Sequence, residues 1–328
     1  MSNQDNEVSW ANVWFQIRKE MGDFTGIRFG RIHPEDSEPD WFFVPHDEHD
    51  GACGLAHTLR QLKVLDCHSF PVRHEKKVEF TDPFTPPTPL TQYLPHAWWK
   101  NFDLSWQQST PAASKATAVS WHVFSRAETI HLLTKCREKQ ITLNSHLLWA
   151  LTESISLDID SNPSSILWVL PIDVRDAVSA SSRSGNFIST FDVVVDRKQS
   201  VNDLNYSIRT LLTDGRHWKN LRYLNWSKWQ DKDLVKKIIL DLKFKRQIGI
   251  FSNLGIWPPP ASQRLADFSS EDQWLFSPCA FHNLPFAAGC LTWLDQLSIV
   301  LQAHPALTPE KAKSDQWMER WKSSVLKI

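Results

Sequence analysis

The stretch that decides the fold reads Trp41-Phe42-Phe43-Val44-Pro45-His46-Asp47-Glu48-His49-Asp50-Gly51. Its first four residues are apolar and largely aromatic, which is typical of a buried strand, and the proline after them ends that strand. Leucines at helical spacing follow over residues 52–62. The stretch therefore predicts a strand, a tight polar turn and a helix, in that order.

The polar turn carries the densest cluster of ionisable residues in the chain. A strand that ends at Pro45 would fix the imidazole of His46, and the turn would expose it. A histidine with a pKa near 7 is a natural general base for taking a proton from a hydroxyl or an amine. Asp50 could lock the turn through a cation elsewhere in the chain, and Gly51 would let a substrate or backbone approach closely.

The pattern His46-x-x-x-Asp50-Gly51 resembles the HxxxDG motif of the chloramphenicol acetyltransferase-like superfamily. That superfamily includes peptide-synthetase condensation domains, plant acyltransferases and wax-ester synthases. Segments that are similar to other parts of these proteins follow in the same order, at residues 141–144, 170–175, 185–189 and 251–255. The resemblance covers roughly residues 41 to 305.

The resemblance implies an α/β fold of the α+β two-layer type, with two lobes and an active site in the channel between them. His46 aligns with the catalytic histidine. Asp50 and Gly51 align with the structural part of the motif, and Arg175 is the expected partner of the aspartate. Donors to a developing oxyanion, or contacts to substrate, are expected among Ser252, Asn253 and Asn186.

The function that the resemblance implies is acyl transfer from a thioester to a hydroxyl or amine, with His46 as general base. Acyl-CoA or a phosphopantetheinyl carrier would be the co-substrate, with no tightly bound cofactor and no metal. The partners would be the thioester donor, a small-molecule acceptor and, in one version, an acyl carrier protein; an oligomer is compatible with the sequence. The alternative is a catalytically degenerate relative that binds an acyl carrier, a small ligand or another protein.

The sequence departs from the family pattern in three places. The common motif begins with two histidines, and Pro45 stands at the first of these positions. The DFGWG motif of the plant enzymes is absent. Many relatives carry about a hundred residues before the motif and this chain carries 45, which predicts that part of the first lobe is missing or compressed.

Other chemistries are open for the same residues. His46 could be a histidine that only hydrogen-bonds the backbone of its turn. With His49 and the neighbouring carboxylates it could bind a divalent metal, although the spacing is not that of a helical H-E-x-x-H site. Cys53 could be a nucleophile beside His46 or His57, but a lone cysteine at a helix start is more often a small buried hydrophobe. A G-x-S-x-G nucleophile elbow is absent from the sequence.

Composition excludes several classes of protein. The formal net charge of −1 gives no long-range attraction for nucleic acid, and 10 glycines in 328 residues include no phosphate-binding glycine loop. Five scattered cysteines suit reduced thiols. The N-terminus does not resemble a signal peptide, and no apolar run approaches the roughly 20 residues of a membrane span. We therefore expect a cytoplasmic protein without a membrane span.

The rest of the chain predicts two lobes, residues 1–110 with the motif and a connection rich in proline and tryptophan, and residues 111–328. Strands are predicted at 24–29, 117–124, 166–172, 187–195, 248–252, 286–291 and 296–301. Helices are predicted at 13–21, 126–139, 201–212 and 231–246, with a further helix capped by Asn144. The 17 tryptophans suit packing; Trp98, Trp99 and Trp257 are candidates for a channel or lid.

Overall fold

The computed structural model describes most of the chain. The described residues are 10–64, 117–158, 165–175, 185–227, 229–242, 247–257, 271–281, 284–305, 307–308 and 310–328. The predicted connection at 71–111, with Trp98 and Trp99, and the three prolines after Trp257 lie outside these ranges.

Helices and strands alternate along the chain, as the hydrophobic patterns predicted. The helices are α1 (Trp10–Glu20), α2 (Gly51–Gln61), α3 (Arg126–Glu138), α4 (Leu143–Ser156), α5 (Val201–Thr213), α6 (Arg216–Ser227), α7 (Lys232–Leu242) and α8 (Lys311–Val325). The strands are β1 (Gly26–Ile32), β2 (Asp40–Pro45), β3 (Val119–Val123), β4 (Ser165–Asp173), β5 (Ile188–Asp196), β6 (Gln247–Trp257), β7 (Gln273–Ser277), β8 (Phe286–Trp293) and β9 (Gln296–Ala303). The mixed α/β fold class is therefore confirmed.

The strands form two sheets. The larger has six strands in the order β3-β9-β8-β6-β4-β5, and β6 runs parallel to both of its neighbours, β4 and β8. The smaller has three strands in the order β2-β1-β7, all antiparallel. Strand β7 comes from the second half of the chain, so the sheet that carries the motif is completed by residues far away in sequence. The division into lobes at residue 110 stays a prediction.

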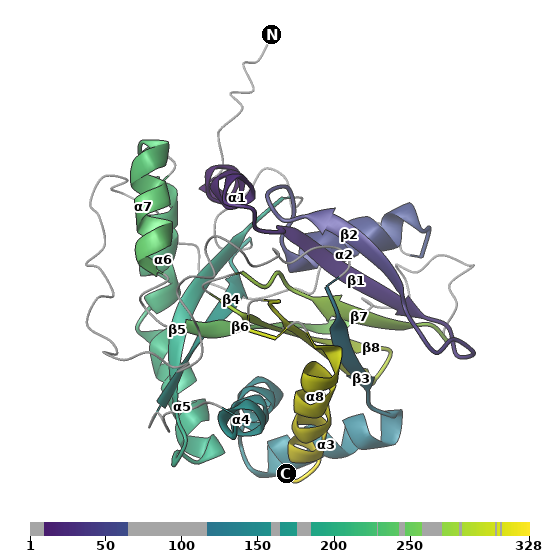
Figure 1. Cartoon of the computed structure of the whole chain (residues 1–328). Helices are drawn as coiled ribbons and strands as arrows, with labels where there is room; N and C mark the ends of the chain where they lie inside the picture. The colour runs from purple at the N-terminus through teal and green to yellow at the C-terminus, as the bar shows by residue number, and fades with distance from the viewer. Residues whose placement is uncertain are drawn as a thin grey trace.

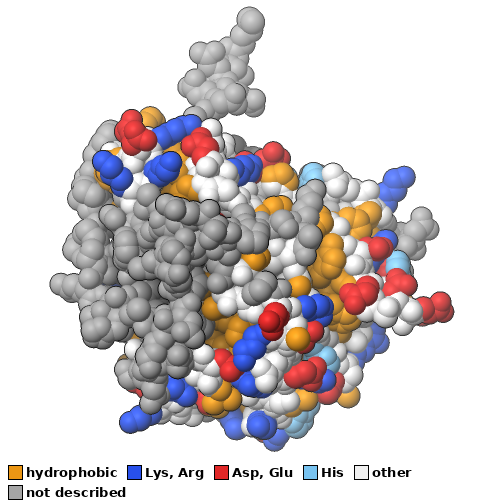
Figure 2. Space-filling model, viewed as in Figure 1, with side chains coloured by type: hydrophobic (Ala, Val, Ile, Leu, Met, Phe, Trp, Pro, Cys, Tyr) orange, Lys and Arg blue, Asp and Glu red, His pale blue; other side chains and the backbone are white. Residues whose placement is uncertain are grey.

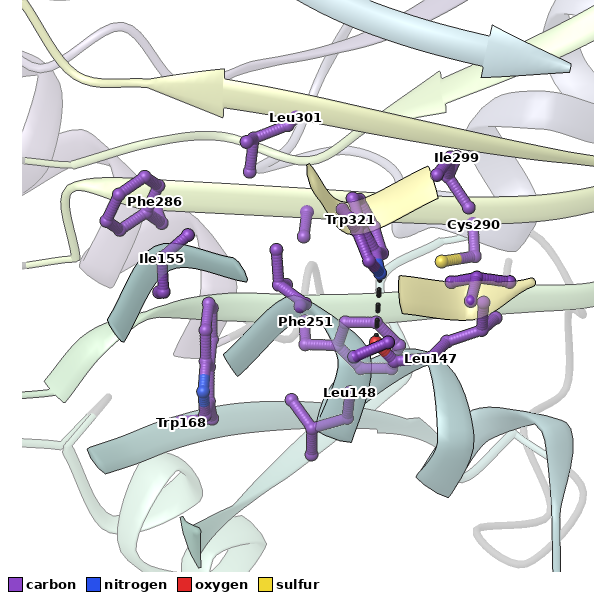
Figure 3. Close-up of a cluster of buried hydrophobic side chains, with 14 of the residues drawn as sticks. Leu147, Leu148, Ile155, Trp168, Phe251, Phe286, Cys290, Ile299, Leu301 and Trp321 are labelled. Carbon is purple, nitrogen blue, oxygen red and sulfur yellow. Dashed lines mark hydrogen bonds between the residues drawn. The ribbon is translucent and has the colours of Figure 1, made fainter. Parts of the chain in front are cut away.

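A large apolar core lies between the six-stranded sheet and the helices below it in Figure 1, α3, α4 and α8. Figure 3 shows this core, in which Trp168, Phe251 and Phe286 from the strands meet Leu147, Leu148 and Trp321 from the helices. The indole nitrogen of Trp321 donates a hydrogen bond to the backbone oxygen of Leu147, 3.0 Å away. Aromatic side chains thus join α4, α8 and the sheet, as expected for tryptophans that serve packing.

A second apolar core lies on the other face of the large sheet, under α1, α2 and the three-stranded sheet. Its members include Phe15 of α1, Leu55 of α2, Phe276 of β7 and Trp257 and Trp293 of the larger sheet. The predicted channel or lid function of Trp257 has no support in this environment, because the side chain is fully buried in the core. This second core holds the N-terminal segment and the motif against the rest of the molecule.

Several local predictions can be compared with the structure. The capping box of Ser125 and Glu128 at the start of α3 is present. The cap of α4 is Thr142, not the predicted Asn144, because the Thr142 side chain accepts the backbone N–H of Ser145. The pattern gave no prediction for α6, β7 or α8.

Helix α7 packs against α1. Among the residues of α7 whose burial is described, Val235 and Ile239 are buried and pack with Ile17 of α1. Leu234, which its apolar character would place inside, is 40% exposed. The contact with α1 decides which side chains are covered, and the sequence of α7 alone cannot reveal it.

The described surface has no field of a single charge sign on the face in Figure 2, where basic and acidic side chains are interspersed. Among the helices of the described residues, none has the length and apolar character needed to cross a membrane.

Candidate active site

The predicted strand, turn and helix are present. Strand β2 ends at Pro45, helix α2 begins at Gly51, and residues 46–50 between them are called the motif turn below. The oxygen of Pro45 accepts the N–H groups of Glu48 and His49, at 3.3 and 3.1 Å. The N–H of His46 donates to the oxygen of Thr25, at 3.1 Å, which ties the turn to the segment before β1. These backbone bonds fix the place where the imidazole leaves the chain.

Asp50 closes the motif turn and starts the helix. Its backbone is extended, and its Oδ1 accepts the N–H of Cys53 at 2.9 Å, so it is the N-cap of α2. Its Oδ2 accepts the N–H of Phe187 at 2.8 Å. Nη2 of Arg175 donates to both carboxylate oxygens, at 2.6 and 2.7 Å. The structure thus brings Asp50 and Arg175 together, and both side chains are almost completely buried.

Arg175 has a second carboxylate partner that the sequence did not single out. Its Nε donates to the two oxygens of Asp173, at 2.9 and 2.8 Å, and its backbone N–H donates to the same side chain. Burial opposes the charge of Arg175, but Asp50 and Asp173 outweigh it and raise the pKa of the guanidinium. Burial raises the pKa of Asp173 despite the attraction of Arg175. The i, i+2 spacing at the end of β4, which puts both side chains on one face, is the signal that could have found Asp173.

His46 is half-buried beside three elements. Its Nδ1 lies 3.0 Å from the backbone oxygen of His49. The side-chain amide of Asn186 donates to the backbone oxygen of His46, at 2.6 Å. The ring of Phe15, from α1, lies with its centroid 4.3 Å from the imidazole centroid. In Figure 1, helix α1 lies between α7 and the β1–β2 hairpin.

The protonation state of His46 follows from these contacts. Burial lowers the pKa of His46, outweighing the hydrogen bond to the His49 backbone and the nearby carboxylates of Asp50 and Asp47, which raise it. A carbonyl oxygen can only accept, so the contact with His49 favours the tautomer with the proton on Nδ1, whereas the amide nitrogen of Asn186, 3.2 Å from Nδ1, favours the other. With the proton on Nδ1 the lone pair is on Nε2, and no hydrogen bond to Nε2 is present among the described residues. A neutral imidazole with a free Nε2 is the form that a general base needs.

A short segment before β5 holds the motif turn from the other side. Gly185 has φ of +136°, a region that favours glycine, and its oxygen accepts the N–H of Asp50 at 3.4 Å. Its own N–H donates to Sγ of Cys53 at 3.2 Å. Asn186 and Phe187 add the two bonds to His46 and Asp50 given above. This Gly185–Phe187 segment thus contacts three residues of the motif region.

Cys53 lies inside this arrangement and is almost completely buried. Its sulfur is 3.1 Å from Nδ1 of His49, whose ring stacks on His57. Burial lowers the pKa of His49. The thiol packs with the second core, as expected for a small buried hydrophobe, and its contacts join α2 to the Gly185–Phe187 segment.

Strand β6 carries the other two predicted residues. Ser252 is buried, and Oδ1 of Asn253 accepts the N–H of Gly255 at 2.8 Å. The strand passes close to the motif. Leu254 is so near to Gly51 that a Cβ added to this glycine would lie 2.8 Å from Cδ2 of Leu254. Among the described residues, no hydrogen bond joins Ser252 or Asn253 to His46. Their function at an oxyanion stays a prediction.

A metal site was one of the alternatives for the motif turn. The described ranges contain no group of three or more His, Cys, Asp or Glu side chains placed to hold a metal ion.

Comparisons with known proteins identify the fold. No protein-family model matches the sequence, and no curated protein matches it. Among solved structures, the chain is similar to the epimerization domain from the third module of tyrocidine synthetase B, at 14% identity with a TM-score of 0.53. That match covers 100% of this chain and 78% of the other.

Two further structures match over smaller parts. The trichothecene 15-O-acetyltransferase of Fusarium sporotrichioides matches at 14% identity with a TM-score of 0.48, over 64% of this chain and 46% of that one. Polyketide synthase associated protein 5 of Mycobacterium tuberculosis matches at 14% identity with a TM-score of 0.44, over 65% and 52%. The matched part of this chain therefore covers about half the length of these two proteins.

Proposed function

We propose that this chain, whose fold is similar to that of the epimerization domain from tyrocidine synthetase B, is an acyltransferase. It would move an acyl group from a thioester, either acyl-CoA or an acyl carrier protein, to a hydroxyl or an amine. The observation that carries the proposal is the place of His46: its Nδ1 lies 3.0 Å from the His49 oxygen, Asn186 holds its backbone, and burial lowers its pKa. A histidine in this setting would serve as the general base of the transfer.

The reaction would proceed in two proton transfers through one histidine. Nε2 of His46 takes the proton of the acceptor as its oxygen or nitrogen attacks the thioester carbonyl, and a tetrahedral oxyanion forms. The oxyanion collapses, the carbon–sulfur bond breaks, and the imidazolium returns the proton to the departing thiolate. The products are the ester or amide and a free thiol, so atoms and charge balance.

Ser252 is the better of the two β6 candidates for a hydrogen bond to the oxyanion. Successive side chains of a strand point to opposite faces. Ile250 and Leu254 pack in the second core, on the motif side of the sheet, whereas Phe251 packs in the first core. Ser252 shares the face of Ile250 and Leu254, whereas Asn253 shares the face of Phe251. We therefore assign the donor function to the Ser252 hydroxyl.

The experiment is a thiol-release assay. The protein is incubated with a panel of acyl-CoAs and acyl-phosphopantetheine donors, each with hydroxyl and amine acceptors, and the free thiol is measured. We expect His46→Ala to lower turnover by about 10²–10⁴-fold, the usual contribution of a general base. His131→Ala, at an exposed position of α3, is the matched control and should leave turnover unchanged.

The same assay can reject the proposal. Thiol release that survives undiminished in His46→Ala would remove His46 from the chemistry. If no donor is turned over but a donor binds, the degenerate binding protein becomes the better explanation.

A further inference from the structure

The side chain of Asn186 contacts both the backbone and the ring of His46. Its amide nitrogen donates to the backbone oxygen of His46, at 2.6 Å, and lies 3.2 Å from Nδ1 of the same residue. Both contacts join the Gly185–Phe187 segment to the one residue of the motif turn that carries the proposed chemistry.

The orientation of the amide is fixed by its partner. If the amide were flipped, its oxygen would face the oxygen of His46 at 2.6 Å, and two acceptors at that distance repel each other. The nitrogen must therefore point to His46. One of its two protons is donated to the backbone oxygen, and this bond joins the side chain to the main chain of His46.

The two neighbours of Nδ1 favour opposite tautomers of the imidazole, and the shorter contact, to the oxygen of His49, favours the proton on Nδ1. With the proton on Nδ1, the ring donates to the oxygen of His49. Without it, the Nδ1 lone pair would face that carbonyl oxygen at 3.0 Å, which is repulsive, although it could then accept from Asn186. Asn186 holds the backbone from which the ring extends, while Phe15 packs against the ring itself.

The other end of the Asn186 side chain is poorly suited to a purely structural function. Its Oδ1 is buried and has no hydrogen-bond partner among the described residues. A buried amide oxygen without a partner costs stability, and such groups call for an explanation. The side chain of Asn186 thus makes a short hydrogen bond to His46 through its nitrogen, while its oxygen makes none among the described residues.

We propose that Asn186 is a positioning residue for His46: it holds the main chain of His46 so that Nδ1 stays protonated against His49 and Nε2 presents its lone pair to the acceptor. The inference rests on the proposed function only for the final step, the use of Nε2 as a base. The positioning itself is a property of the free protein and can be measured without any substrate.

The experiment combines nuclear magnetic resonance with kinetics. Long-range ¹H–¹⁵N spectra of the protein with ¹⁵N-labelled histidine report the tautomer of each ring, and His46→Gln identifies the His46 signals. We expect the wild type to show the Nδ1–H tautomer at neutral pH. Asn186→Ala should mix the two tautomers and lower kcat about 10- to 100-fold with little change in KM. Its unfolding transition should stay near that of the wild type, because the unpartnered oxygen disappears together with the bond.

A matched control is available elsewhere in the chain. The amide of Asn220 donates to the backbone oxygen of Thr190 at 2.6 Å, the same kind of bond at the same length, but outside the site. Asn220→Ala should leave the His46 tautomer and kcat unchanged. Asn186→Asp, which places a carboxylate near Nδ1, should raise the pKa of His46 and move the acid limb of activity to higher pH.

The outcomes separate the two proposals. An unchanged His46 tautomer in Asn186→Ala would overturn the positioning function, whatever happens to kcat. A shifted tautomer in a protein that turns over no thioester would leave the positioning function standing and reject the acyltransferase.

Discussion

The two ends of the motif turn lie four residues apart and differ in what surrounds them. At one end Asp50 is sealed, with its carboxylate saturated by Arg175, Cys53 and Phe187. At the other end His46 is half-buried, with one ring nitrogen held and no hydrogen bond to the other among the described residues. The difference suggests a division of labour, in which the aspartate end fixes the turn and the histidine end stays open for chemistry.

The largest expected effect is at the sealed end. Asp50→Asn removes the charge that faces Arg175 inside the protein, and removing one partner of a buried ion pair costs about 3–5 kcal/mol. Asp173 still faces the guanidinium, so we expect a loss of about 3 kcal/mol, at the lower end of that range. Urea denaturation measures the change in unfolding free energy.

The matched control lies in the same turn. Asp47 pairs with Lys19 of α1 at 2.7 Å, but this pair is exposed to solvent. Exposed pairs contribute about 0–1 kcal/mol, so Asp47→Asn should be nearly neutral. Equal losses of unfolding free energy in Asp50→Asn and Asp47→Asn would contradict the special importance of the buried aspartate end of the turn.

The next effect concerns the fit between the turn and strand β6. In Gly51→Ala the added Cβ would lie 2.8 Å from Cδ2 of Leu254 and 3.1 Å from Cζ of Phe276. Overpacking of this kind costs about 1–3 kcal/mol. Leu254→Val removes the nearer atom, so the double variant should lose less than the sum of the two single variants in thermal or urea unfolding. If the losses of stability in the two single variants simply add up in the double variant, the turn can move away from β6.

The smallest effect is the response of stability to acid at the open end. Burial lowers the pKa of His46 in the folded protein, so between pH 7 and 5 the unfolded chain binds more protons and stability falls as the pH falls. Burial lowers the pKa of other histidines in the same way: His49, His57, His122, His146 and His217. His46→Gln should therefore flatten part of the slope of unfolding free energy against pH, measured by denaturation at several pH values. An unchanged slope would mean that folding does not lower the pKa of His46.

The sequence predicted the local structure of the site well because the signals are local. An aromatic run stopped by Pro45, a polar turn and a leucine-spaced helix depend on residues within a few positions of each other. The pairing of Asp50 with Arg175 was predicted from the family resemblance, because the matched motifs include both residues although they lie far apart in sequence. Asp173 was not assigned a function by the resemblance, so its contact with Arg175 was not predicted.

Other features depend on contacts that no local pattern contains. Helix α7 buries Val235 because α1 packs on it, and Leu234 is left outside. Strand β7 is five residues long and gave no clear pattern, yet it completes the sheet that carries the motif. Phe15 gave no signal of its position against His46, since 30 residues separate them.

By itself, the sequence determined the strand, turn and helix of the motif and the alternation of elements, because backbone sterics and hydrophobic periodicity act over a few residues. The tertiary structure alone decided which neighbours the motif turn has. Arg175 and Asp173, the Gly185–Phe187 segment and Phe15 converge on it from distant parts of the chain. The pKa of His46 and its tautomer follow from that convergence, because burial and hydrogen bonding are properties of the folded surroundings and not of the residue.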